Sequence, residues 1–223
     1  MSEKTDMLDK GAVLQRDRET YAIVPHIPGG IILDIDMLHK IADVAKKYDA
    51  KALKLTSAQR IAIVGIEQDK IDSAWEDLGM DKGAAVGMCV RSVRICPAMT
   101  FCKRAQQDSV PLGLEIDKKY HGAQFPGKVK ISVSGCPNSC AESLVRDVGL
   151  VGLKNGYRVY IGGSASSQAK IGKLLAENVA QDDVMPLLEK IFDFYSKNAR
   201  KHERIGMMID RLGFETVKQG ILN

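Results

Sequence analysis

Residues 128–140 have the sequence KVKISVSGCPNSC, in which a regular alternation gives way to a pair of cysteines. Apolar and polar residues alternate from Val129 to Val133, which predicts a strand with one apolar face. The Gly135-Cys136-Pro137 segment ends this strand, because proline cannot continue a strand ladder. Cys136 and Cys140 are therefore expected in a loop that directly follows a strand.

A second pair of cysteines lies upstream, and 33 residues separate the two pairs. The upstream pair, Cys96 and Cys102, encloses five residues, whereas the downstream pair encloses three. Pro97 is favoured at a first helical position, so we expect a helix over residues 98–108 with Cys96 in the loop before it. A straight helix would turn two side chains with this spacing onto different faces, so only that loop position lets the pair converge.

The number of cysteines, five, is odd and argues against a complete set of disulfides. In a chain without a secretory signal, cysteines are metal ligands, reactive thiols or small buried hydrophobes, and the last is our interpretation of Cys89. Zinc sites favour two to four residues between paired cysteines, so four-thiolate iron–sulfur ligation fits the spacing better. Structural zinc and unliganded thiols remain the alternatives. The small residues around Cys136 also suit a cluster, because their backbone N–H groups can approach anionic sulfurs closely.

The composition is that of a folded soluble domain, since 45% of the residues are hydrophobic and 27% are charged. A length of 223 residues permits one large domain or two small ones. No apolar run has the roughly 18 residues of a membrane helix, and the charged N-terminus lacks a secretory signal, so we expect a cytoplasmic protein. A net charge of +4 predicts no nucleic-acid surface but is compatible with anionic ligands. No Gly-x-Gly-x-x-Gly motif indicates a nicotinamide or flavin domain.

Hydrophobic periodicity indicates an α/β pattern in the first part of the chain, before the cysteines. There we expect strands over residues 21–24, 52–55 and 61–66, and helices over residues 35–48 and 71–78, the first with Ile35, Leu38, Ile41, Ala42 and Ala45 buried. The strongest later signal is a hairpin, in which Val148–Leu153 and Tyr157–Ile161 flank the turn-forming Asn155-Gly156 pair. Beyond Ser167 we expect helices, the clearest over residues 184–195 and 205–212.

The motifs Cys96-x5-Cys102 and Cys136-x3-Cys140 closely resemble those of the sirohaem and 4Fe-4S sulfite and nitrite reductases. The hairpin from Asp147 to Gly163 is similar to that family too, and Pro28-Gly29-Gly30 and Leu55-Thr56-Ser57 resemble segments of its ferredoxin-like lobe. Larger members contain two copies of this unit. This chain has one copy and therefore resembles the small, single-repeat sulfite reductases.

The resemblance implies an α+β fold, with a ferredoxin-like lobe packed on an α/β lobe that binds sirohaem and a 4Fe-4S cluster. We expect the N-terminal arm and ferredoxin-like lobe at residues 1–82, the cofactor-binding lobe at residues 83–165, and C-terminal helices packing on that lobe at residues 166–223. The implied activity is the six-electron reduction of sulfite to sulfide with an external one-electron donor. The alternatives are nitrite reduction to ammonia, a non-catalytic iron–sulfur or sirohaem electron-transfer protein, and a zinc-stabilised interaction module.

The same resemblance implies the site residues. The implied cluster ligands are Cys96, Cys102, Cys136 and Cys140, the last of which also bridges to the sirohaem iron. Sulfite and nitrite are anions and sirohaem carries eight carboxylates, so fixed cations are needed. The implied catalytic residues are Lys128, Lys130 and Arg91, and the implied sirohaem contacts are Thr56, Gln59, Arg60, Arg94, Asn138 and Cys140. From spacing alone, the two lysines share one strand face, which a solvated surface explains equally well.

Two positions depart from the family pattern. Ala58 stands where a Leu-Thr-x-Arg-Gln segment has its sirohaem arginine, and Arg60 is the expected substitute. Val24 stands where larger members have a substrate-site arginine, with His26 as a neighbouring cation or proton donor. We expect an acidic ferredoxin or flavodoxin as the electron donor, because the chain is positively charged. A second copy of the chain is a candidate partner, because a single repeat can leave an apolar face uncovered.

Overall fold

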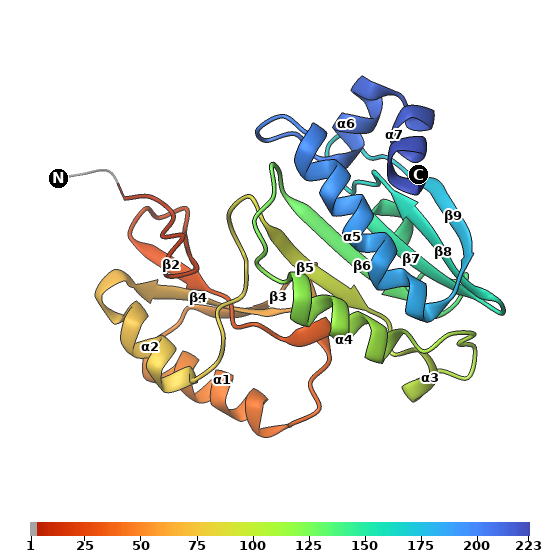
Figure 1. The fold of residues 1–223 in the computed structure, drawn as a ribbon. Helices are drawn as coiled ribbons and strands as arrows, with labels where there is room; N and C mark the ends of the chain where they lie inside the picture. The colour runs from red at the N-terminus through yellow and green to blue at the C-terminus, as the bar shows by residue number, and fades with distance from the viewer. Residues whose placement is uncertain (1–3) are drawn as a thin grey trace. The chain divides into compact units, whose positions relative to one another are not determined.

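The computed structural model describes residues 4–223, and the chain forms two compact units, Met1–Gly87 and Met88–Asn223 (Figure 1). Each unit has its own sheet and its own hydrophobic core, and helices and strands alternate irregularly in both. The fold class is therefore α+β, as predicted. Among residues 4–223, no helix is long and apolar enough to cross a membrane.

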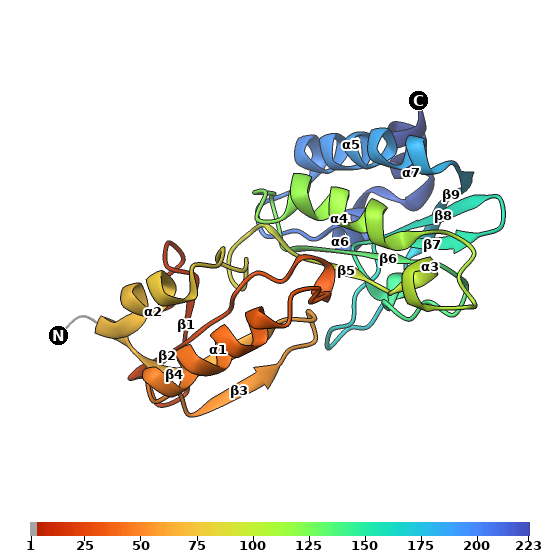
Figure 2. The same ribbon diagram turned by 90° about the horizontal axis from the view of Figure 1, so that it is seen from below.

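The first unit is built on an antiparallel sheet with the strand order β1-β2-β4-β3. Its elements are β1 (Ala12–Leu14), β2 (Thr20–Ile23), a 3-10 turn (Pro28–Gly30), α1 (Asp36–Lys47), β3 (Ala52–Leu55), β4 (Ile61–Glu67), a second 3-10 turn (Gln68–Lys70) and α2 (Ile71–Leu78). Both α-helices cover the same face of this sheet (Figure 2). Their apolar residues pack on buried strand residues such as Tyr21, Ile23 and Ile63.

The predicted strands and helices of this unit all form, and β1 forms in addition within a segment predicted to be an arm. The buried face of α1 differs from the prediction. Ile41 and Ala45 are buried as expected, and Val44 joins them, but Ala42 is exposed. Ile35 and Leu38 are 61% and 39% exposed. Ile35 lies outside the packed stripe because α1 begins only at the next residue.

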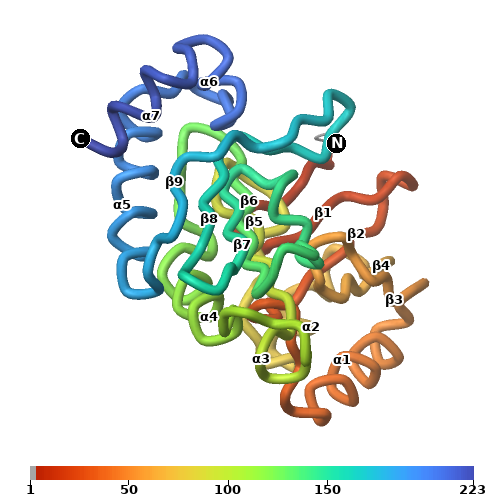
Figure 3. The backbone as a smooth tube through the Cα atoms, turned by 90° about the vertical axis from the view of Figure 1, so that its right-hand side faces the viewer, coloured from red at the N-terminus to blue at the C-terminus, as the bar shows by residue number. Residues whose placement is uncertain are grey.

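The second unit contains a mixed sheet whose five strands follow the order β5-β6-β7-β8-β9. The pairs β5–β6 and β6–β7 are parallel, whereas the pairs β7–β8 and β8–β9 are antiparallel. Its elements are β5 (Val90–Ile95), α3 (Ala98–Phe101), α4 (Ser109–Tyr120), β6 (Val129–Ser134), a 3-10 turn (Ser143–Val145), β7 (Val148–Leu153), β8 (Gly156–Ile161), β9 (Lys173–Val179), α5 (Gln181–Asn198), α6 (Ile205–Leu212) and α7 (Phe214–Leu222). Helices α4 and α5 cover one face of the sheet (Figure 3).

The hairpin β7–β8 and helices α5 and α6 confirm the sequence predictions for this unit. The helix predicted over residues 98–108 is wrong, because α3 ends after one turn at Phe101 and α4 begins only at Ser109. The expectation of helices throughout the region beyond Ser167 is also wrong, because β9 extends the sheet there. Strand β5 and helix α4 were not predicted, whereas α7 lies in the C-terminal region that was expected to be helical.

The two faces of β6 differ in chemistry. Val129, Ile131 and Val133 are fully buried in the core beneath the helices. The alternate residues, from Lys130 to Ser134, point to the opposite face, because successive strand side chains alternate. On that face the core is replaced by serines and charged side chains, and the candidate site lies there.

Candidate functional site

The two cysteine loops converge because they follow neighbouring parallel strands. Cys96 comes directly after β5, and Cys136 follows the end of β6, whose Val133 pairs with Ile95. The carboxyl ends of parallel strands lie at one edge of a sheet. The backbone N–H of Gly135 donates to Cys96 Sγ at 3.1 Å, so the downstream loop touches a cysteine of the upstream loop. Cys96 Sγ also lies 3.4 Å from Ser109 Oγ at the start of α4.

Close backbone packing holds these loops. A Cβ atom on Gly135 would lie 2.6 Å from the Gln107 carbonyl oxygen and 2.8 Å from Ala98 Cβ, so only glycine fits there. Three non-glycine residues of the loops, Ala98, Ser139 and Glu142, have positive φ angles of 41°, 50° and 59°. Such left-handed residues cost energy and concentrate at functional sites. The loops thus have the strained backbone typical of a site.

The five cysteines have different surroundings. Cys96 and Cys136 are buried, Cys102 is half-buried, and Cys140 is exposed. Cys89 is buried, and its backbone forms an isolated β-bridge with Gln124 away from the loops, which agrees with its interpretation as a small core residue. In the part of the chain from residue 4 onward, no three His, Cys, Asp or Glu side chains stand close enough to bind one metal ion. The structure therefore brings the loops of the predicted ligands together without gathering the thiols into one group.

Lys128 and Lys130 lie at the start of β6 and share the polar face of the sheet. Burial, together with the charges of Arg146, Lys128 and Arg204, lowers the pKa of Lys130 from 10.5 to about 8. Burial and the charges of Arg204 and Arg91 also lower the pKa of Lys128. Both lysines are half-buried, whereas a fully solvated lysine would keep its usual pKa, so their surroundings differ from those of a plain solvated strand face.

The predicted residue Arg91 lies at a β-bulge. The pairing of β5 with β6 shifts between Val90 and Ser92, which leaves Arg91 out of register. A bulge of this kind turns a side chain away from its regular direction. Arg91 interacts electrostatically with Lys128, so the structure brings the three predicted catalytic residues into one region of the second unit.

Arg94 and Arg146 form a buried pair of arginines, of which the sequence analysis identified only Arg94. The carboxylate of Glu142 accepts a hydrogen bond from Arg94 Nη1 at 2.6 Å and another from Arg146. The Arg94 and Arg146 side chains are only 10% and 4% exposed. Within residues 4–223, the Nε atoms of both arginines are buried without a hydrogen-bond partner. Two guanidinium groups share one carboxylate here, so the site has a surplus of buried positive charge.

Asp147 and Arg204 form a further ion pair close to these arginines and lysines, and neither was predicted as a site residue. Arg204 donates from Nε and Nη2 to the two oxygens of Asp147 at 2.9 and 2.6 Å. Asp147 begins the hairpin segment that resembles the family but was given no role there, and Arg204 lies far from the cysteines in sequence. No local signal could have identified it. In all, six cations and two carboxylates interact in this region: Arg91, Arg94, Lys128, Lys130, Arg146 and Arg204, with Glu142 and Asp147.

Thr56, Gln59 and Arg60 form the turn between β3 and β4 in the first unit. Thr56 N–H donates to the Arg60 carbonyl at 2.8 Å, and Thr56 Oγ1 accepts from the Arg60 N–H at 3.2 Å. The Arg60 side chain is buried close to Gly83, and Gln59 has a positive φ of 58°. These contacts give the turn a fixed shape. Asn138 lies exposed in the loop between Cys136 and Cys140.

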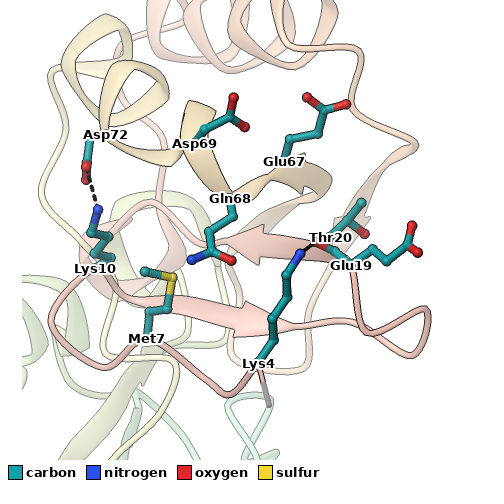
Figure 4. Close-up of a pocket in the computed structure, with 9 residues that line it drawn as sticks. All are labelled: Lys4, Met7, Lys10, Glu19, Thr20, Glu67, Gln68, Asp69 and Asp72. Atoms are coloured by element: carbon teal, nitrogen blue, oxygen red, sulfur yellow. Dashed lines mark hydrogen bonds and ion pairs between the residues drawn. The ribbon is translucent and has the colours of Figure 1, made fainter. Parts of the chain in front are cut away.

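Two cavities lie apart from the cysteine loops. The larger, about 670 Å³, is in the first unit, and Figure 4 shows the residues that line it, with Lys10 pointing to Asp72 and Lys4 to Glu19. None of the predicted site residues lines it. The smaller, about 100 Å³, is in the second unit beside Asp147 and Arg204.

Comparisons with known proteins agree with this arrangement. A family model described as the nitrite and sulphite reductase 4Fe-4S domain matches residues 86–223, and one described as the nitrite/sulfite reductase ferredoxin-like half domain matches residues 13–80. The chain is 41% identical to the assimilatory-type sulfite reductase of Nitratidesulfovibrio vulgaris over 213 residues, which cover 96% of this chain and 97% of that protein. It is 37% identical to a nitrite reductase (NAD(P)H) of Bacillus subtilis over 95% of this chain but only 26% of that protein. Among solved structures, dissimilatory sulfite reductase I matches 91% of this chain and 69% of its own with a TM-score of 0.81 at 16% identity, a likeness of fold.

Proposed function

Because the chain belongs to the nitrite and sulfite reductase family, we propose that it is a sulfite reductase that forms sulfide with electrons from an external one-electron donor. The observation that carries this proposal is the joining of two cysteine loops and a cation-rich strand face in one unit. The full-length likeness to an assimilatory-type sulfite reductase favours sulfite over other anions.

A 4Fe-4S cluster would be held by Cys96, Cys102, Cys136 and Cys140. The fit rests on the loops themselves: the Gly135 N–H already donates to a cysteine sulfur, and Cys140 is exposed. Backbone donors of this kind stabilise anionic sulfur ligands. The free thiols of all five cysteines are in keeping with a reducing compartment such as the cytoplasm.

Sirohaem fits the surplus positive charge of the second unit. The buried Nε atoms of Arg94 and Arg146, which have no hydrogen-bond partner among residues 4–223, suit the carboxylates of such a group. Cys140 would provide its iron ligand, and Asn138 lies on the same loop. Thr56, Gln59 and Arg60, in a turn of fixed shape in the first unit, stay a prediction that rests on the resemblance. When bound, sirohaem and the cluster would supply electron transfer to the sulfur atom of sulfite.

The chain's own residues would hold and protonate the anion. Lys128, Lys130 and Arg91 provide three positive charges for the oxygens of sulfite. Lys130 is suited to proton donation from Nζ, because its pKa of about 8 lies near neutral pH. Each oxygen that leaves as water needs protons, and a lysine with this pKa can release one and regain it from solvent.

Nitrite reduction is the second candidate, and the likeness to nitrite reductases supports it. The same cations would bind nitrite, whose charge is also carried on oxygen. The test is an anaerobic assay of the purified protein with an artificial one-electron donor, with sulfite and nitrite compared at equal concentrations. Sulfide formation supports the proposal. Absorption without sirohaem bands, or the absence of sulfide, would contradict it.

Two partners remain proposals. The donor would be an acidic ferredoxin or flavodoxin, which the net charge of +4 favours. A second copy of the chain could pair along β3, an edge strand with Leu53 and Leu55 exposed. Light scattering at micromolar concentration tests the homodimer, and a monomeric mass would exclude it.

A further inference from the structure

Asp147 is the most deeply buried carboxylate of the charged region, and its bonds link three segments of the chain. It lies directly before β7, and its side chain is 1% exposed. Asp147 Oδ2 accepts the backbone N–H of Lys130 in β6 at 2.8 Å. The same carboxylate accepts two hydrogen bonds from Arg204, the residue before α6. A planar guanidinium that binds both oxygens fixes position as well as charge.

Arg204 is held from a third direction. Its Nη1 donates to Ser164 Oγ at 2.8 Å, just after the Gly162-Gly163 turn that ends β8. The beginning of α6 touches that turn at backbone distance, because a Cβ on Gly206 would lie 2.4 Å from the Gly162 carbonyl oxygen. The beginning of α6 is thus held against the sheet through Asp147, which also binds the backbone of Lys130.

We propose that Arg204 and Asp147 act as a positioning pair that fixes Lys130, and through the same strand the nearby Lys128, for the substrate anion. The inference rests on the proposed function, which assigns these lysines to sulfite. Asp147 holds the backbone of Lys130 directly, and Arg204 adds a positive charge that acts on both ammonium groups. The C-terminal segment, far from the cysteine motifs in sequence, thereby takes part in the site.

The electrostatics of the lysines agree with this geometry. Arg204 lowers the pKa of both lysines, whereas Asp147 raises them. Arg204 and Asp147 act on both lysines, Arg91 acts on Lys128, and Arg146 and Lys128 act on Lys130. Removing Arg204 should therefore raise both lysine pKa values.

Glu203 and Arg211 offer a matched control in the same segment. Arg211 donates to the two oxygens of Glu203 at 2.8 and 2.6 Å, so this pair has the same two-bond geometry. It adjoins Arg204 in sequence, yet neither Arg211 nor Glu203 is among the main charges that act on either lysine. Arg211→Gln thus removes an equivalent ion pair without disturbing the lysines.

The test measures how fast each lysine reacts with limiting acetic anhydride across a pH series, by mass spectrometry of the purified protein. In wild type, the labelling midpoint of Lys130 should lie at about 8. Arg204→Gln should raise the midpoint of both lysines, and that of Lys128 more clearly, because Arg204 is the strongest of the charges that lower the pKa of Lys128 and the weakest of those that lower the pKa of Lys130. It should also lower kcat/KM for sulfite about ten- to a hundredfold at neutral pH. Arg211→Gln should leave both quantities at their wild-type values.

A double variant keeps the test valid if Arg204→Gln fails to fold. Asp147→Asn with Arg204→Gln leaves no unpaired buried charge and should still lose turnover. An unchanged Lys128 midpoint in folded Arg204→Gln, or an equal shift in Arg211→Gln, would overturn the inference. If wild type reduces neither anion while the midpoint shifts as expected, the proposed function fails and the positioning pair stands.

Discussion

Lys130 illustrates how a single strand residue can acquire a special charge state. Its pKa of about 8 means that the ammonium group is charged below that pH and neutral above it. We expect kcat/KM for sulfite to be steady near neutral pH and to fall about tenfold per unit above about pH 8. An unaltered decline in Lys130→Met would assign it to another group.

Neutralising the lysines tests whether they hold the anion at all. Lys128→Met and Lys130→Met should each remove a charge-assisted contact and cost about 1.5–3 kcal/mol, or roughly ten- to a hundredfold in kcat/KM. Iron and sirohaem content should be retained. Lys118→Met, on the exposed last turn of α4, is the control and should change stability by less than about 0.5 kcal/mol. Wild-type kinetics in both test variants would remove the pair from the site.

The cysteines make separate predictions. Cys140→Ser should abolish turnover and the electronic coupling of cluster and sirohaem, because serine is a poor substitute for a bridging thiolate. Cys89→Ser changes a buried thiol outside the loops and should leave the cofactor content intact. Visible absorption and iron analysis of the two variants provide the measurement. Coupled spectra in Cys140→Ser, or cluster loss in Cys89→Ser, would show that the ligands are different.

At the scale of elements, sequence patterns were sufficient where local rules coincide with the fold. The Asn155-Gly156 pair and its flanking apolar runs identified β7 and β8 almost residue by residue. Strand β5 was not predicted because the bulge at Arg91 interrupts its alternation of apolar and polar residues. Strand β9 has a helix-like composition, KLLAENV, and only its pairing along β8 makes it a strand. Tertiary contacts thus overrode local preference.

Helix α4 and the charged region show the same limit. Gly113 weakens helix propensity in α4, yet it is needed because a Cβ would lie 2.5 Å from the Ile95 side chain. The cysteines and lysines were predictable because their motifs are local. Arg146 and Arg204 were not, since only the packing of β7 and α6 brings them to the lysines.

A prediction at this scale concerns the turn between β6 and β7. A Cβ on Gly149 would lie 1.8 Å from the Ser143 carbonyl oxygen, so the strand and the turn touch at backbone level. Gly149→Ala should lower the free energy of unfolding by more than about 3 kcal/mol, because neither backbone can move freely. Gly122→Ala meets no atom within 4 Å and strains only a φ of +75°, so it should cost about 1 kcal/mol. Equal denaturation midpoints for the two variants would contradict this packing argument.

At the scale of the whole molecule, the proposed function requires a place where an electron donor can approach the cysteine loops. The exposed surface beside Cys102 has the composition of a protein-docking site. Met99 and Phe101 are 62% and 70% exposed on α3, and Lys103 and Arg104 follow on the exposed loop. Large exposed apolar residues with adjacent positive charge suit an acidic protein partner.

We therefore expect Lys103→Glu with Arg104→Glu to impair reduction only when a protein donor is used. The double change replaces two positive charges with two negative ones, so the KM for an acidic ferredoxin should rise about tenfold or more at low salt. High salt should weaken the wild-type interaction and narrow this difference, because it screens exposed charges. Lys190→Glu with Lys201→Glu makes the same change of net charge at exposed positions of the C-terminal segment and should have little effect. Rates with a small artificial donor should be equal in all three proteins, since that donor needs no docking surface. An equal rise in KM in both double variants would indicate a response to net charge and exclude a docking site beside α3.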